Sequence, residues 1–131
     1  MANSIAAPGA GEGDEGRADI VAEKMLLGAL MLGESDSVHQ AFSIVSTEDF
    51  ALAKHAELFA AFQSLTEAHR LIDVITVTDE LKRRGQLQQI GGVVYLFRLA
   101  DSLPDLSVSV TSLAQQIRRN AEFRRHGESS F

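Results

Sequence analysis

Apolar residues recur at helical spacing along almost the whole chain after residue 18. The clearest pattern lies between His55 and His69, where the i, i+3, i+4, i+7 rule describes one continuous stripe. The stripe consists of Leu58, Phe59, Phe62, Leu65 and Thr66. Because an amphipathic helix buries such a stripe against other elements, and every strong pattern in the chain has this period, the sequence predicts an all-α fold.

Three further segments near the start of the pattern carry helix signals. Residues 19–32 open with acidic side chains, which suit a helix N-terminus, and then become apolar on nearly all sides, as expected of a buried helix. Ser35 or Asp36 can cap a short helix that follows. Residues 46–49 place a hydroxyl at a cap and an acid three residues later, a variant of the capping box that predicts another short turn.

Residues 71–77 resemble a β-strand in composition. No second strand is available to pair with this segment, and a lone strand is not stable, so we expect an extended connector. Thr76 is a good N-cap for the next helix, with Asp79 three residues later, and Gly85 is a suitable end for it.

The last part of the chain predicts two helices joined by a short break at Pro104 and Asp105. The first, residues 93–103, carries two apolar stripes rather than one, and the second repeats apolar residues from Leu106 to Ala121. Two helices so connected are expected to form an antiparallel hairpin. The predicted architecture is therefore a compact bundle of about six helices that ends in this hairpin.

Composition divides the chain into three parts. Residues 1–18 are rich in Gly, Ala and small polar side chains, and they predict a disordered tail because they offer almost no apolar surface to offset ordering entropy. Residues 19–125 form the expected helical domain, and residues 126–131 a flexible end. The tail lacks the basic start and apolar stretch of a secretory signal.

No residue pattern indicates catalysis, a cofactor or a metal. The chain has no cysteine, which excludes disulfides and thiolate ligands and fits a cytoplasmic protein. Phosphate-binding loops and hydrolase motifs are absent from the sequence. His55 and His69 stand at opposite ends of one predicted helix, about 21 Å apart at the helical rise, which is too far to share a metal. The longest apolar run is too short to span a bilayer.

The net charge of −6 argues against a protein that binds nucleic acid through clustered basic residues. From residue 106 onward the chain contains four arginines and two glutamates, which give a net charge of +2. This basic end is best interpreted as a solvated helix face. Residues 76–85 resemble the first helix of a helix-turn-helix reader. The segment that should supply the recognition helix is apolar, so a DNA-binding regulator is the less favoured alternative.

Several sequence blocks, in order, resemble the N-terminal domain of the bacterial replicative DNA helicase, the DnaB-type hexameric helicase. The first is Glu-Lys-Met-Leu-Leu-Gly-Ala-Leu-Met-Leu at residues 23–32. The second is Ser-x-Glu-Asp-Phe at residues 46–50, followed by His55 and Phe59. The third begins with Ile-Asp-Val-Ile-Thr-Val at residues 72–77 and continues through Arg84-Gly85 to Ile90-Gly91-Gly92, Tyr95-Leu96, Leu99-Ala100 and Pro104. Together the blocks cover residues 19–125.

The resemblance implies a non-catalytic assembly domain. In the family, helical hairpins pair two protomers, three pairs form a collar above the ATPase ring, and the collar side receives primase or a helicase loader. In this sequence the corresponding hairpin is residues 93–125. The expected partners are further copies of the chain and primase or a helicase loader. Neither a membrane nor a specific nucleic acid is expected to bind this domain. The candidate pairing residues are Tyr95, Leu99, Leu103, Leu113 and Ile117.

This sequence departs from the family pattern in three places. Ala53-Lys54 precede His55, where a proline is frequent, and Ser112-Leu113 stand where tyrosines are usual. The chain stops at Phe131, where a linker and an ATPase domain are expected. It is therefore interpreted as a fragment of a helicase, with a free-standing modulator of helicase ring assembly as the alternative.

Overall fold

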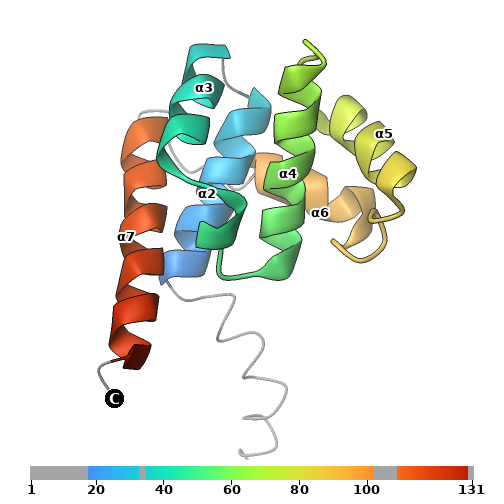
Figure 1. The fold of residues 1–131 in the computed structure, drawn as a ribbon. Coiled ribbons are helices and arrows are strands. Elements are labelled where there is room, and N and C mark those ends of the chain that lie inside the picture. Colours follow the sequence, from blue (N-terminus) through green and yellow to red (C-terminus); the bar gives the residue numbers. More distant parts are fainter. Residues whose placement is uncertain (1–17, 33–34, 102–108, 130–131) are drawn as a thin grey trace, which may run out of the picture.

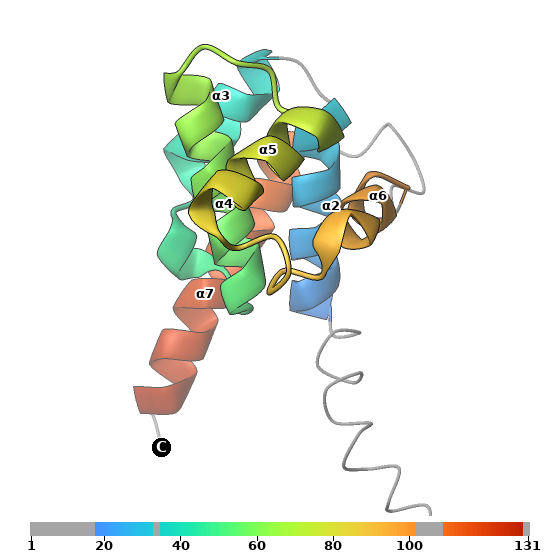
Figure 2. The same cartoon turned by 90° about the vertical axis from the view of Figure 1, so that its right-hand side faces the viewer.

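A computed structural model describes residues 18–32, 35–101 and 109–129 of the chain. The described residues form six α-helices and one short 3-10 helix, η1, and no strand (Figures 1 and 2). The elements in chain order are α2 (Ala18–Leu32), α3 (Ser35–Ile44), η1 (Thr47–Asp49), α4 (Ala53–Glu67), α5 (Val74–Arg84), α6 (Gly92–Asp101) and α7 (Val110–Ser129). The prediction of an all-α bundle is confirmed.

Helix α2 is the centre of the bundle. It packs against α7, α6 and α4, and α3 packs against α7 on the same side of the molecule (Figure 1). Leu26, Leu27 and Leu30 of α2 have no solvent exposure. The sequence predicted a buried helix here because its apolar residues point in every direction, and a helix of that kind needs neighbours all round.

Helix α4 buries the stripe that the periodicity predicted. Leu58, Phe59, Phe62 and Leu65 are all in the core. The ring of Phe59 meets Phe42 of α3 edge-on, with centroids 5.2 Å apart, and lies 5.0 Å from the ring of Phe50. Aromatic pairs in these geometries add to the energy of burial, so Phe59 ties α3 and the segment after η1 to α4.

The capping-box variant at residues 46–49 is confirmed. The backbone N–H of Ser46 donates to the carboxylate of Asp49 over 3.0 Å, and Thr47–Asp49 form the 3-10 turn. The guanidinium of Arg125 donates to Asp49 over 3.0 Å, and Arg124 donates to the Asp49 carbonyl over 2.9 Å. The turn is therefore also the attachment point for the C-terminal half of α7.

The start of α5 differs from the sequence prediction. The N-cap is Asp73, not Thr76: the Thr76 N–H donates to the Asp73 carboxylate over 2.8 Å, and the Asp73 N–H donates to the Thr76 hydroxyl over 3.0 Å. Thr76 therefore lies inside the first turn as the second member of a capping box. The extended connector is shorter than predicted, because β-branched residues 74–77 become helical once Asp73 caps them.

Helix α5 ends at Gly85, as predicted. Gly85 adopts φ +72°, a left-handed conformation that glycine takes without steric cost.

In the last turns of α5 the buried carboxylate of Glu80 accepts hydrogen bonds from Arg83 over 2.5 Å and from Arg84 over 2.8 Å. The hydrogen bond from Arg83, with that from Arg84, holds the pKa of Glu80 below its usual value.

The two helices of the predicted hairpin are α6 and α7, and the connection between them lies outside the described residues. Helices α6 and α7 each pack on α2 and make little contact with each other among the described residues; Figure 1 shows α7 at one side of α2 and α6 at the other. The prediction of a hairpin assumed that a short connection makes consecutive helices pack on each other, whereas the described parts of both helices pack on α2. Helix α2 is apolar all round, so it buries the stripes of both helices better than they would bury each other.

The domain boundaries predicted from composition stay a prediction. Helix α2 starts at Ala18, and α7 continues to Ser129, beyond the predicted domain end at residue 125. Most of the predicted tail, residues 1–17, lies outside the described residues.

A residue in the turn that follows α4 has an unusual backbone conformation. His69 adopts φ +60°, and the Arg70 N–H donates to the Leu65 carbonyl, the pattern of a helix C-terminus closed by a left-handed residue. Because a side chain is strained there, we expect His69→Gly to raise the free energy of unfolding by about 0.5–1 kcal/mol in urea titrations. Ala68→Gly, at a negative φ, is the matched control and should lower it. If both substitutions lowered the free energy of unfolding equally, the backbone at His69 would not be strained.

Candidate interaction surfaces

A chain of hydrogen bonds crosses the interior from α2 through α4 to α6. Glu23 and His55 are 1% and 0% exposed. The His55 Nδ1 lies 2.7 Å from Glu23 Oε1, and its Nε2 lies 2.6 Å from the Tyr95 hydroxyl. The second Glu23 oxygen accepts from the Ala51 N–H over 2.6 Å. We refer to Glu23, His55 and Tyr95 as the buried polar network.

The buried polar network has a self-consistent arrangement of protons. Because a carboxylate oxygen accepts, the imidazole Nδ1 donates to Glu23, and the Tyr95 hydroxyl can then donate to Nε2. The ring of Tyr95 lies over Gly91, whose φ is +110° and where an added Cβ would stand 3.0 Å from the Tyr95 Cβ. A network in which every member is paired stabilises the packing of α6 on α2 and α4.

The predicted pairing residues have different positions in the single chain. Leu99, Leu113 and Ile117 are buried in the core. Tyr95 is partly buried and belongs to the buried polar network, and Leu103 lies outside the described residues. Their part in pairing stays a prediction, but three of the five side chains face inward here. They are not available at the surface of this fold.

The exposed apolar side chains of α6 lie on its opposite side. Val93, Val94 and Phe97 are exposed, and Phe97 retains 54% of its area in solvent. Phe97 follows Val93 by four residues and Val94 by three, so both valines lie beside it on the helix surface. We call these three residues the α6 outer face. The sequence signal for it was the presence of apolar residues on more than one side of this helix, from which the pairing prediction chose Tyr95 and Leu99 instead of these three.

The basic residues of α7 are largely engaged within the chain. Arg124 approaches Asp19 at 3.4 Å, Arg125 pairs with Asp49 at 3.0 Å, and Arg118 pairs with Glu122 at 3.3 Å. Such contacts stabilise the position of α7 and leave fewer cations for phosphate. The interpretation of this end as a helix face, rather than a nucleic-acid surface, agrees with the geometry.

No described helix has the length and apolar character needed to cross a membrane. Within residues 18–32, 35–101 and 109–129, no three His, Asp or Glu side chains are grouped as a metal site would require. The fold and its surfaces thus define an all-helical domain with a polar network that runs through its core and an exposed apolar face on α6.

The chain belongs to the family described as the DnaB-like helicase N terminal domain, whose model matches residues 16–119. The resemblance inferred from the sequence is therefore confirmed. The replicative DNA helicase DnaB of Geobacillus stearothermophilus is 37% identical over 106 residues, which are 81% of this chain and 23% of that protein. The DnaB helicase of Leifsonia xyli is 38% identical over 86 residues, 66% of this chain and 19% of that protein.

A solved structure supports the same assignment. The crystal structure of the N-terminal domain of DnaB helicase from Mycobacterium tuberculosis matches with a TM-score of 0.79 and 29% identity, covering 85% of this chain and 79% of that one. The chain spans about a quarter or less of the length of the curated helicases it matches. The matched part is the N-terminal domain of those proteins.

Proposed function

We propose that this domain is a non-catalytic assembly module of a replicative DNA helicase, which associates with further copies of itself and docks primase or a helicase loader in the cytoplasm. The observation that carries the proposal is the match to the DnaB N-terminal domain along most of the chain, in sequence and in fold. In a full-length ring the expected arrangement is a trimer of dimers. The chain also carries no phosphate-binding loop of its own.

The α6 outer face is the surface that fits self-association best. Its three apolar side chains are exposed together, and contiguous exposed apolar surface typically marks a protein contact. The face is held at a defined angle because Tyr95 and Leu99, on the inner side of the same helix, attach α6 to the core. A helix-turn-helix reader would instead need basic and polar side chains there, and Arg98 is the single basic residue of α6.

We expect Phe97→Asp to abolish self-association without unfolding the domain. A carboxylate at this exposed position costs little in the single chain, but at an interface it would be buried without a partner. Light scattering over a concentration series should show a mass above one chain for the wild type and the mass of one chain for the variant. The matched control is Leu71→Asp, an exposed leucine on another part of the molecule.

Two results would contradict this proposal. If the Phe97→Asp variant associated as the wild type does, the contact between copies would not involve the α6 outer face. A wild-type mass of one chain at every concentration would show that the isolated domain does not assemble. Partner docking is measured separately, by biolayer interferometry with purified primase and purified loader from the same organism. Binding of neither protein would exclude the docking role.

A further inference from the structure

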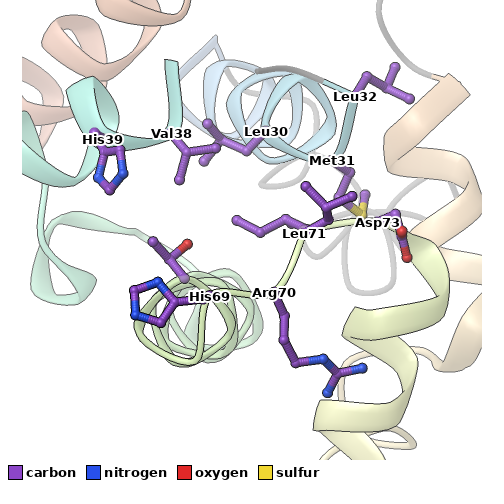
Figure 3. Close-up of a pocket in the computed structure, with 11 residues that line it drawn as sticks. Leu30, Met31, Leu32, Val38, His39, His69, Arg70, Leu71 and Asp73 are labelled. Atoms are coloured by element: carbon purple, nitrogen blue, oxygen red, sulfur yellow. The ribbon is translucent and has the colours of Figure 1, made fainter. Parts of the chain in front are cut away.

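A pocket of about 440 Å³ opens where α2 ends, between α3, the end of α4 and the connector to α5 (Figure 3). Its inner wall is apolar and belongs to the core: Leu30, Met31, Val38 and Ile72. The volume falls within the range of pockets that accept a small molecule or a large side chain. The pocket is separate from the buried polar network, none of whose residues lines it.

The edge of the pocket exposes large apolar side chains. Leu71 and Leu32 line it and retain 77% and 58% of their area in solvent. Ile75, the second residue of α5, retains 73% of its area in solvent. Covering this edge would remove apolar surface from water at about 25 cal/mol per Å². An occupant of the pocket therefore gains most if it carries a large apolar side chain.

Three side chains at the mouth can donate hydrogen bonds to an occupant. His39, His69 and Arg70 line the pocket, and none of them forms an ion pair within the described part of the chain. Figure 3 shows the two imidazoles on the same side of the pocket, one from α3 and one from the end of α4. The lining carboxylate, Asp73, already accepts from the Thr76 N–H. An occupant rich in acceptors complements this mouth.

The backbone at His69 supports a role for this mouth. Its left-handed φ of +60° is a position where glycine relieves strain, as argued above. Strained side chains persist where the surrounding structure or a function requires them. Here the strained residue places an imidazole at the edge of the pocket.

We propose that this pocket docks an acidic segment of a partner protein. One large apolar side chain of the segment enters the pocket, and its carboxylates accept hydrogen bonds from Arg70, His39 and His69. The inference rests on the partner-docking part of the proposed function and assigns that role to a defined surface. Leu71 and Leu32 cover the apolar side chain from the edge.

The test is an amide-resolved NMR titration of the full 131-residue chain. The probe is the peptide Asp-Glu-Leu-Phe-Asp-Glu. One comparison peptide replaces its acidic residues with lysine, and a second replaces Leu-Phe with Ser-Ser. We expect the first peptide to shift the amides around Leu30–Leu32 and His69–Asp73, and both comparison peptides to bind roughly tenfold more weakly.

Two variants test the two parts of the site. Arg70→Glu reverses the charge at the mouth, and Leu71→Asp removes the apolar edge; both residues are exposed, so neither change disturbs the core. We expect each to weaken the probe roughly tenfold. Phe123→Asp, on α7 and 77% exposed, lies outside both proposed surfaces; it is the control and should leave the affinity unchanged.

Three outcomes would overturn the inference. They are no shift of pocket amides with the acidic peptide, equal binding of the lysine peptide, and full affinity in the Arg70→Glu variant. Pocket amides that shift with protein concentration alone would show that a second copy is the occupant. If primase or loader binds the Arg70→Glu and wild-type chains equally, the pocket inference fails while partner docking stands. If neither partner binds the wild type, docking itself fails, whatever the peptide does.

Discussion

Replacing Leu99 with aspartate is expected to unfold the domain. Leu99 is 1% exposed and packs in the core where α6 meets α2. A carboxylate without a partner in that position costs several kcal/mol, and the leucine contacts are lost as well. Domains of this size have a total stability of about 5–15 kcal/mol, so the sum removes most or all of it. The Leu99→Asp chain should lack a cooperative thermal transition in circular dichroism.

The matched control is Phe97→Asp, two residues earlier on the same helix and 54% exposed. It receives the same carboxylate and should melt within a few degrees of the wild type, corresponding to about 0.5 kcal/mol. If the Leu99→Asp chain folded normally, the inner side of α6 would not be buried in the core. The pair also decides which variant can report on pairing, because a loss of association in an unfolded chain says nothing about an interface.

Removing the carboxylate of Glu23 should produce the second large effect. In Glu23→Ala the Nδ1–H of His55 and the N–H of Ala51 both lose their acceptor inside the core. Leaving buried donors unpaired and opening a cavity beside them is expected to cost about 3–5 kcal/mol. Urea unfolding followed by circular dichroism measures the change, with the m-value as a check that the transition stays two-state.

Two further glutamate variants make this result specific. Glu48→Ala removes an exposed carboxylate from η1 and should change the free energy of unfolding by no more than about 0.5 kcal/mol. Glu23→Gln keeps an oxygen that can accept from one of the two donors and should fall between the alanine variant and the wild type. If Glu23→Ala lost no more than Glu48→Ala, the buried polar network would contribute nothing to the fold.

The buried polar network and the α6 outer face belong to the same helix, which links stability to the proposed assembly. Tyr95 donates inward toward His55, while Phe97 projects from the other side. The hydrogen bond between Tyr95 and His55 helps to set the angle at which the α6 outer face would meet a second copy. The pocket lined by Leu71 and Arg70 uses different elements and can act independently.

Much of the fold follows from the sequence. The stripe in α4, the all-round apolar character of α2 and the stop at Gly85 are local patterns, and each determines its element through helix period or backbone preference. The order of the blocks also identified the family, because several weak motifs in the right sequence constrain a chain more than one alone. The start of α5 was misplaced because two possible caps, Asp73 and Thr76, stand three residues apart.

Only the tertiary structure decided which side of a helix meets which neighbour. Helices α6 and α7 each carry enough apolar surface for a hairpin, and the presence of α2, far away in sequence, redirects both. Leu99 and Phe97 look alike in the pattern, yet one is core and one is surface. Likewise His55 gives no sign in sequence of its partners 32 residues before and 40 residues after it. Helix period is a local property, whereas partner choice depends on all the surfaces that compete for burial at once.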